Sequence, residues 1–234
     1  MNFIQSAIKA NQKILELIKK GNPDLKKQLN IGAGGDISRV VDIEAEKIFV
    51  HYLEKFGQII SEESGITGNG KDKIIIDPID GSENFISGLP YFGSSVARKR
   101  DKEVFESVVV NFATGDLFVK QNNDFKRADI NRLEFSEITM NNYATIGIYE
   151  RAYASSKFIY KINEEGFKYR SPGALALSLA NAHNFTFVIF EGNIREYDVA
   201  AGLHMCSDMD IFLKDDILIV SKEKDIFKKL ITIV

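Results

Sequence analysis

The chain has 234 residues, and its 30 Lys and Arg residues against 33 Asp and Glu residues give a formal net charge of −3 at pH 7. This near balance argues against a nucleic-acid-binding protein, which usually carries a basic excess or patch. Hydrophobic residues make up 44% of the chain and charged residues 27%, a composition typical of a globular protein and not of a disordered chain.

Cysteine content and hydropathy predict where the chain works. Cys206 is the only cysteine, which excludes an intrachain disulfide and fits a reducing compartment. The N-terminal segment is amphipathic and lacks the continuous apolar core of a signal peptide. No window approaches the apolar length of a membrane span. We therefore expect a cytoplasmic protein that contacts no membrane.

Two helices separated by a glycine-rich segment come first in chain order. Residues 3–18 place apolar side chains mostly on one face, and Gly-Asn-Pro at 21–23 ends this helix. A second helix is expected from about Asp42 to Phe56. The segment between them, residues 29–39, contains three glycines, which predicts an irregular loop.

From residue 58 the apolar period changes from that of helices to that of strands. Strands are expected at 58–63, 73–77, 94–100, 104–112, 116–120, 144–150, 167–171, 185–190, 210–214 and 217–221. Helices are expected at 155–165, 174–182, 198–208 and the C-terminus. This mixture predicts a layered α/β or α+β architecture. We expect one domain over 1–234, with approximate halves 1–138 and 139–234.

The most informative segment follows the strand at 73–77. Asp77 and Asp80 lie three residues apart at the end of the most hydrophobic strand, and Pro78 lacks the amide hydrogen of a ladder, so the strand should end there. Gly81 permits a tight turn, and Ser82 is a good N-cap for a short helix, whose free N–H groups favour an anion such as phosphate.

Two carboxylates beside an anion site call for cations between them. At about 4 Å, two like charges repel by roughly 4 kcal/mol at an effective dielectric constant of 20. Divalent metal ions reverse that sign, and all-oxygen ligands favour ions of the Mg²⁺ type. The alternative is that both aspartates only shape a turn, because Asp-Pro and Asp-Gly are common turn dipeptides.

Three further acidic segments repeat this arrangement. Glu62 and Glu63 directly follow an apolar strand, Asp42 lies at the start of a helix, and Asp198 heads a helix of small residues. Each has an ordinary alternative: Asp at a helix start is common, and glutamates after strands are often solvated. Together with Asp77 they form a recognisable order along the chain.

These segments resemble the inositol monophosphatase / fructose-1,6-bisphosphatase superfamily of Mg²⁺-dependent phosphatases, which have layered αβαβα folds. DPIDGSENF matches the pattern D-P-[IL]-D-G-[ST]-x-N-F, SEES matches the superfamily's Glu-Glu segment, and EYDVAAG matches its C-terminal Asp segment. RSPGALALSLA at 170–180 is weakly similar to a substrate-side segment. ISEESG, the run DPIDGSENFISGLPYF and Arg195 resemble archaeal-type members that hydrolyse both inositol-1-phosphate and fructose 1,6-bisphosphate.

The resemblance implies an α+β sandwich with one acidic pocket that binds two to three Mg²⁺ ions. The implied metal ligands are Glu62, Asp77, the Ile79 carbonyl, Asp80 and Asp198. The implied catalytic residues are Ser82, Asp42 and Glu62, with the Gly81 and Ser82 amides holding the phosphate. The implied substrate contacts are Asp80, Ser171, Gly173, Ala174, Glu191 and Arg195. Glu63 would lie behind the ligands, and Asp36 would help to hold a third, weaker ion through waters.

Three residues depart from the superfamily pattern. Glu83 stands where Thr, Ser or Phe is common, which adds negative charge near the phosphate. Ala174 and Leu175 replace the usual [ST]-Ala pair, which reshapes the sugar-side pocket. Arg195 is a candidate for the second phosphate of a bisphosphate, with an ion pair to Glu191 or Glu196 as the alternative.

Other reactive residues are expected to be structural. His51, His183, His204 and Cys206 fall in or beside helices, and we interpret them as packing or surface residues. The charged run at 97–103 is interpreted as a hairpin that exposes solvated charges, with phosphate binding as the alternative.

The leading hypothesis is a Mg²⁺-dependent phosphoric monoester hydrolase acting on inositol-1-phosphate and fructose 1,6-bisphosphate through metal-activated water. A 3′-phosphoadenosine 5′-phosphate nucleotidase is the second enzyme hypothesis, although no insertion supplies an adenine slot. An inactive metal or sugar-phosphate binding protein is the alternative from another class. The expected partners are a small sugar or polyol phosphate and, since homodimers are common in the superfamily, a second copy of the chain.

Overall fold

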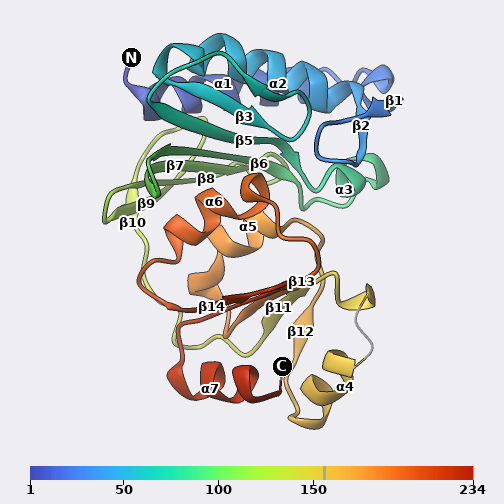
Figure 1. Cartoon of the computed structure of the whole chain (residues 1–234), viewed down its shortest axis with the longest axis vertical. Coiled ribbons are helices and arrows are strands. Elements are labelled where there is room, and N and C mark those ends of the chain that lie inside the picture. Colours follow the sequence, from blue (N-terminus) through green and yellow to red (C-terminus); the bar gives the residue numbers. More distant parts are fainter. Residues whose placement is uncertain (155–156, 234) are drawn as a thin grey trace.

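The computed structural model describes residues 1–154 and 157–233. Figure 1 shows five stacked layers in these ranges: helices, a sheet, helices, a second sheet and a last layer of helices. The predicted α+β fold with αβαβα layers is confirmed. Of the helix predicted at 155–165, residues 155 and 156 lie outside the described part. The helices are α1 Phe3–Lys19, α2 Val40–Leu53, α3 Ser82–Ser87, α4 Lys157–Glu164, α5 Leu175–Ala180, α6 Glu196–Met205 and α7 Lys224–Ile233.

The first layer is formed by α1 and α2, which cover the outer face of the larger sheet (Figure 1). A capping box begins α1: the Asn2 side chain accepts a hydrogen bond from the Gln5 N–H (2.9 Å), and the Gln5 side chain accepts one from the Asn2 N–H. Phe3, Ala7 and Ile14 on one face of α1 are completely buried against the sheet. The predicted helix at 3–18 is therefore confirmed to within one residue.

The larger sheet has eight strands in the described ranges, in the order β10-β9-β8-β7-β6-β5-β3-β4. β3 pairs parallel with β5, and the other neighbours are antiparallel. The sequence did not predict β4, β9 or β10, which are short or largely exposed. The strands are β3 Gln58–Ser61, β4 Gly65–Thr67, β5 Asp72–Asp80, β6 Gly93–Arg100, β7 Glu103–Asn111, β8 Asp116–Gln121, β9 Asp124–Asp129 and β10 Ser136–Glu137.

Strand β5 continues through Pro78, so the prediction that it ends there is wrong. Asp77 pairs with Ser95 and Asp80 pairs with Gly93, with a shift of register between the two pairs. Such an irregularity places the proline where no ladder N–H is required. The strand therefore carries both aspartates into the interior, where each is at most 6% exposed.

The third and fourth layers are formed by α5 and α6 and by a five-stranded sheet of order β12-β11-β13-β15-β14 (Figure 1). β12, β11 and β13 are parallel, and β15 and β14 continue antiparallel. Gly202 lets α6 pack closely on α5, since an added Cβ would lie 2.5 Å from Leu179. The strands are β11 Gly147–Glu150, β12 Tyr169–Arg170, β13 Val188–Glu191, β14 Asp210–Lys214 and β15 Ile217–Ser221.

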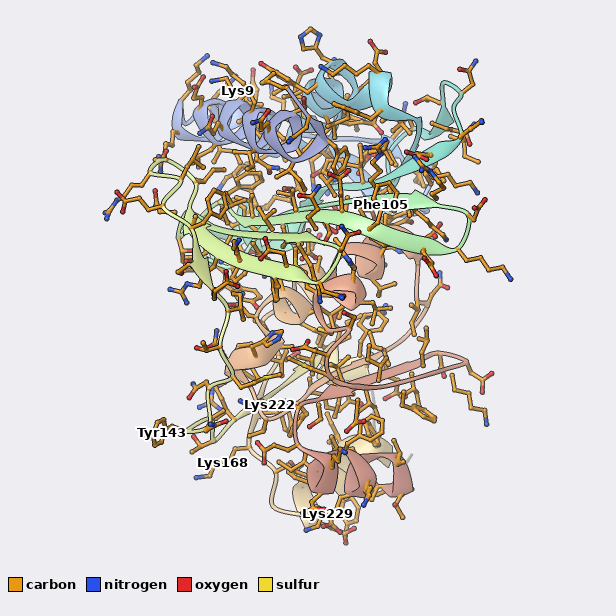
Figure 2. All side chains as sticks on the ribbon, turned by 90° about the vertical axis from the view of Figure 1, so that its left-hand side faces the viewer. Lys9, Phe105, Tyr143, Lys168, Lys222 and Lys229 are labelled. Carbon is orange, nitrogen blue, oxygen red and sulfur yellow. The ribbon has the colours of Figure 1, made fainter. Side chains whose placement is uncertain are left out.

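The last layer is formed by α4 and α7, which cover the outer face of the smaller sheet (Figure 1). Figure 2 places Lys9 of α1 and Lys229 of α7 at opposite ends of the molecule. No helix in the described ranges is long and apolar enough to cross a membrane. The division into halves at 138 and 139 stays a prediction.

The glycine-rich segment is a small hairpin, not an irregular loop. β1 (Gln28–Ile31) pairs antiparallel with β2 (Ile37–Arg39). The turn between them is held because the N–H groups of Ala33 and Gly34 donate to the carbonyls of Glu63 (2.9 Å) and Glu62 (2.7 Å). An added Cβ at Gly34 would lie 2.2 Å from the Tyr197 hydroxyl, so a larger residue would prevent this approach.

The charged run at 97–103 forms the β6–β7 hairpin, but its arginines are not simply solvated. Arg98 pairs with Asp72 (2.6 Å) and Glu106 (2.9 Å), and Arg100 pairs with Asp72 (2.6 Å). Arg98 also lies over the ring of Phe105. These arginines therefore neutralise the buried Asp72 carboxylate at the far end of β5.

Candidate active site

The main cavity has a volume of about 790 Å³ and brings together segments from both ends of the chain. It is lined by the β1–β2 turn, the ends of β3 and β5, the start of α3, the segment at 171–173 and the start of α6. The predicted site residues that line it are Asp36, Asp42, Glu62, Glu63, Asp77, Ile79, Asp80, Gly81, Ser82, Ser171, Gly173, Arg195 and Asp198.

Two predicted substrate contacts lie elsewhere. Ala174 is buried and packs against Gly81. A Cβ added at Gly81 would lie only 3.0 Å from the Ala174 Cβ. The Glu191 side chain accepts a hydrogen bond of 2.6 Å from the buried Tyr149 hydroxyl. Neither residue lines the cavity in the described part of the chain: Ala174 packs against the Gly81 turn, and Glu191 is held by Tyr149.

Three carboxylates converge at the centre of the cavity. Glu62, Asp77 and Asp198 each offer one oxygen, and these oxygens all lie within 4.8 Å of one another. They come from the segment after β3, from β5 and from the first turn of α6. Such spacing suits a shared cation, because one ion can contact all three oxygens.

Burial disfavours the ionised forms of these carboxyl groups. Desolvation raises the pKa of Asp77 well above its usual range, and the charge of Glu62 adds to that shift. Desolvation also raises the pKa of Glu62 to about 8, although Arg195 opposes the shift. Oδ1 of Asp77 is buried and has no hydrogen-bond partner among the described residues. A buried, unpaired carboxylate oxygen beside two other carboxylates fits a metal ligand.

Asp80 lines the same cavity and is held by α5. Its Oδ2 accepts a hydrogen bond of 2.9 Å from the Leu177 N–H. Desolvation raises the Asp80 pKa well above its usual range, against the effect of that hydrogen bond, and the charge of Glu150 raises it further. One oxygen is therefore oriented by the helix, and the carboxylate as a whole remains in need of a cation.

The turn after β5 places Gly81 and Ser82 at the wall of the cavity. Gly81 has φ +82°, a left-handed conformation that favours glycine, and an added Cβ would lie 3.0 Å from the Tyr91 carbonyl. Gly81, and not Ser82 as predicted, is the N-cap of α3. Ser82 is the first helical residue and also lines the cavity. This corrected position still leaves the first N–H groups of α3 without partners in the helix.

Asp42 faces the cavity from the start of α2. Its Oδ2 accepts a hydrogen bond of 2.7 Å from the Arg39 N–H, while its buried Oδ1 has no partner in the described part of the chain. Desolvation raises its pKa to about 7, against that hydrogen bond. The predicted pairing of Asp42 with Ser82 is not present as a hydrogen bond between described residues, so their joint role stays a prediction.

Arg195 neutralises part of the acidic group. Its guanidinium forms ion pairs with Asp198 (2.9 Å), Glu62 (3.1 Å) and Asp36 (2.5 Å). Burial lowers its pKa, but the hydrogen bond and charge of Asp198 outweigh this effect and raise it above the usual range. The predicted alternative partners, Glu191 and Glu196, are not its partners, and Glu196 pairs with Lys99 instead.

Comparison with known proteins decides the family. A family model described as the inositol monophosphatase family matches residues 2–209. The chain belongs to this family. It is 29% identical to a fructose-1,6-bisphosphatase from Pyrococcus furiosus over 83% of the chain and 76% of that protein. It is 30% identical to a protein named Nus factor SuhB from Vibrio cholerae, over 86% of the chain and 80% of that protein.

The fold of this inositol monophosphatase family member agrees with solved structures. A crystal structure titled inositol monophosphatase–fructose 1,6 bisphosphatase superposes with a TM-score of 0.83 at 21% identity and full coverage of both chains. At that identity the likeness shows the fold. Family membership identifies the chain as a phosphatase, and therefore a hydrolase.

Sequence reasoning missed one buried carboxylate in this phosphatase. Glu150, at the end of β11, lines the cavity and is 1% exposed. It accepts hydrogen bonds from the N–H groups of Gly173 (2.7 Å) and Ala174 (3.3 Å) and from the Ser178 hydroxyl (2.5 Å). Glu150 lies at the end of a predicted strand, as Glu62 and Asp77 do. The criterion that identified those two residues could therefore have identified Glu150.

Glu83, which departs from the superfamily pattern beside the Gly81 turn, is exposed and pairs with Arg39 at 3.1 Å. Arg39 is 8% exposed, and its Nε has no partner among the described residues. The arginine therefore offsets the negative charge that Glu83 adds near the start of α3.

The histidines and the cysteine lie away from the main cavity. His183 is buried and contacts Asp208 (3.2 Å), His204 contacts the Ser107 hydroxyl (2.8 Å), and Cys206 is fully buried. These observations agree with packing roles. His51 is exposed on α2.

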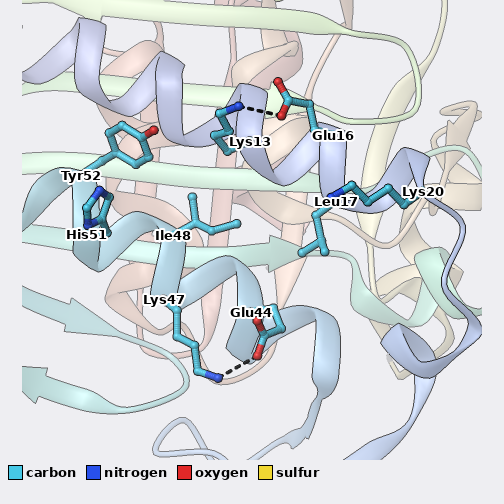
Figure 3. Close-up of a pocket in the computed structure, with 9 residues that line it drawn as sticks. All are labelled: Lys13, Glu16, Leu17, Lys20, Glu44, Lys47, Ile48, His51 and Tyr52. Atoms are coloured by element: carbon cyan, nitrogen blue, oxygen red, sulfur yellow. Dashed lines mark hydrogen bonds and ion pairs between the residues drawn. The ribbon is translucent and has the colours of Figure 1, made fainter.

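A second cavity of about 500 Å³ lies between α1 and α2 on the outer face. Figure 3 shows its rim, where Lys13 pairs with Glu16 and Lys47 pairs with Glu44. Ile48 and Leu17 line it between these pairs. Its acidic side chains are paired with neighbouring lysines, so this groove offers no counterpart to the buried acidic group.

Proposed function

We propose that this phosphatase is a Mg²⁺-dependent phosphomonoesterase that hydrolyses inositol-1-phosphate and fructose 1,6-bisphosphate by attack of water. The observation that carries the proposal is the convergence of Glu62, Asp77 and Asp198 within 4.8 Å, where a buried Asp77 oxygen lacks a partner. The P. furiosus relative named fructose-1,6-bisphosphatase supports the choice of substrate class.

The residues present fit Mg²⁺, which prefers oxygen ligands. Two to three ions would be held by Glu62, Asp77, Asp80, Asp198 and the Ile79 carbonyl. Bound Mg²⁺ supplies polarisation of the phosphate and a lowered pKa for a coordinated water.

The protein's own groups would position the reactants. The free N–H groups of Gly81 and Ser82 are proposed to hold the phosphate at the start of α3. The Ser82 hydroxyl and the unpaired Oδ1 of Asp42 are proposed to orient the attacking water. A pKa of about 7 for Asp42 suits a group that accepts a proton near neutral pH.

Ser171, Gly173 and Arg195, which line the cavity, are proposed to bind the alcohol part of the substrate. The Asn84 side chain donates to the carbonyls of Tyr91 (2.7 Å) and Pro172 (2.7 Å), which links the phosphate turn to the substrate-side segment.

A side-by-side substrate panel tests the proposal. Phosphate release from inositol-1-phosphate, fructose 1,6-bisphosphate and 3′-phosphoadenosine 5′-phosphate is measured with and without Mg²⁺. We expect Mg²⁺-dependent release from the first two. Preference for the third would favour the nucleotidase hypothesis, and no release from any ester would favour an inactive binding protein.

The location and assembly are also proposed: a cytoplasmic homodimer that binds neither nucleic acid nor membrane. The net charge of −3 supports the exclusion of nucleic acid. Light scattering coupled to size-exclusion chromatography tests the dimer, and a mass equal to the 26.3 kDa chain would contradict it.

A further inference from the structure

We propose that Arg195 is an internal counter-cation. In the metal-free protein it pairs with Glu62 and Asp198, and it competes with the divalent ion for these carboxylates. On this view the guanidinium must leave Glu62 and Asp198 before those carboxylates bind metal. The inference rests on the proposed metal-dependent function, because it concerns the same carboxylates.

The guanidinium is fully engaged. Its Nε donates to Asp198 Oδ2 (2.9 Å), and its Nη2 reaches both Asp198 Oδ1 (3.3 Å) and Glu62 Oε1 (3.1 Å). Its Nη1 donates to Asp36 Oδ2 (2.5 Å) and to the Gly34 carbonyl (3.4 Å). The group also lies 4.9 Å from the centre of the Tyr197 ring. Every nitrogen therefore has an acceptor.

These contacts fall on two of the three carboxylates that converge. Glu62 and Asp198 belong to the group whose oxygens lie within 4.8 Å, and both Asp198 oxygens accept hydrogen bonds from Arg195. A cation bound among Glu62, Asp77 and Asp198 would lie close to the guanidinium. Two cations at such a separation repel each other, so the ion and the guanidinium compete for the same carboxylates.

Asp77, the third carboxylate of the group, is not neutralised by Arg195. Among the described residues, Asp77 forms no ion pair with Arg195, and its buried Oδ1 has no hydrogen-bond partner. The guanidinium thus compensates Glu62 and Asp198 but not Asp77. This division keeps the metal-free pocket folded while leaving a carboxylate oxygen open toward an incoming ion.

Arg195 could either compete with Mg²⁺ or position Asp198 for it. Removal of the guanidinium would change the affinity for Mg²⁺ in opposite directions in these two cases. If the guanidinium competes, its removal tightens metal binding. If it instead holds Asp198 in the geometry of a ligand, as partners of metal-binding residues often do, its removal weakens binding.

The test measures Mg²⁺ binding to the full metal-free chain by isothermal titration calorimetry. Arg195→Gln is expected to bind Mg²⁺ about tenfold more tightly, a factor typical of coupling between two ligands. Arg195→Lys keeps the charge and should remain close to wild type. Arg151→Gln is the matched control, since Arg151 lines the same cavity and, in the described part of the chain, pairs with no carboxylate. It should also bind like wild type.

A second measurement covers the case in which Arg195→Gln fails to fold without metal. In the wild type, the Nε–H group of Arg195 should exchange slowly with solvent in the metal-free protein and rapidly at saturating Mg²⁺, as followed by NMR of ¹⁵N-labelled arginine. Slow exchange at saturation would overturn the proposal. So would unchanged or weaker Mg²⁺ binding in Arg195→Gln.

These outcomes separate the inference from the function on which it rests. If the wild type binds no Mg²⁺, the metal-dependent function and this inference both fall. If the wild type binds Mg²⁺ and releases phosphate, but Arg195→Gln binds it no more tightly, only the role of Arg195 is lost.

Discussion

The Glu150 carboxylate accepts a hydrogen bond of 2.7 Å from the backbone N–H of Gly173. This contact joins the end of β11 to the segment that lines the substrate side of the cavity. The same carboxylate holds Ser178, whose hydroxyl lies 3.0 Å from that of Tyr91. Glu150 therefore holds the 171–174 segment through hydrogen bonds, and its charge also raises the pKa of Asp80.

Substitution of Glu150 should impair substrate binding more than metal binding. In Glu150→Gln the side chain keeps one acceptor oxygen and loses the other, so the Gly173 segment loosens. We expect KM to rise about tenfold, equivalent to roughly 1.4 kcal/mol, with kcat changed only a few-fold. Steady-state kinetics with the preferred substrate measure this split. An unchanged KM combined with lower stability would show that Glu150 only supports the fold.

The buried carboxylates make the stability of the metal-free protein depend on pH. Burial raises the pKa of Asp42 from 3.8 to about 7 and that of Glu62 from 4.5 to about 8. At a pH between the two pKa values of either group, its carboxyl is ionised in the unfolded chain and protonated in the folded protein. The unfolded state binds fewer protons, so the free energy of unfolding falls as pH rises.

Urea unfolding of the metal-free protein from about pH 5 to about pH 8 checks this direction. We expect the midpoint to fall across the range, and Mg²⁺ to reduce the fall because bound metal favours ionised carboxylates. Asp42→Asn should make the fall shallower below about pH 7, because it removes one of the carboxyl groups that retain a proton in the folded protein at those pH values. A midpoint that rises with pH in the metal-free wild type would contradict the assignment.

Asp77→Asn should separate metal binding from folding. The substitution removes a charge that is fully buried and repelled by Glu62, so the metal-free protein should be no less stable than the wild type. Stabilisation by Mg²⁺ and phosphate release should both be lost. Thermal unfolding with and without Mg²⁺ gives the first result, and the substrate panel gives the second.

Asp72→Asn is the matched control at the other end of the same strand. Asp72 is also buried, but Arg98 and Arg100 pair with it and hold its pKa below the usual range. Its loss should lower stability and leave the response to Mg²⁺ intact. If Mg²⁺ still stabilises the Asp77→Asn variant, Asp77 is not a metal ligand.

The sequence predicted the convergence of the acidic residues better than the contacts around them. Motif order alone placed Glu62, Asp77 and Asp198 together, and their oxygens do converge. It did not reveal that Arg195 pairs with Glu62, a residue far away in the chain, because ion pairs between distant segments depend on tertiary packing. Glu150 was missed for a related reason: the groups that donate hydrogen bonds to it include the backbone N–H groups of residues 173 and 174, which carry no side-chain signal in the sequence.

Local rules failed where tertiary contacts outweighed them. Pro78 predicts a strand end, yet the shift of register in β5 accommodates it. Residues 29–39 have loop composition, yet backbone hydrogen bonds to Glu62 and Glu63 hold their turn. Ser82 is a favourable N-cap by residue type, but the left-handed Gly81 takes that position.

Ser82→Ala tests the proposed positioning of water. Ser82 lines the cavity at the start of α3, and the unpaired Asp42 Oδ1 lies in the same cavity. If the two groups hold and deprotonate the attacking water, loss of the hydroxyl should lower kcat by roughly 10²–10⁴-fold. Ser87→Ala, at the exposed end of the same helix, removes an identical hydroxyl and should leave kcat near wild type. Because Mg²⁺ alone can orient a water, a loss of only a few-fold in Ser82→Ala would assign that task to the proposed metal ions and not to Ser82.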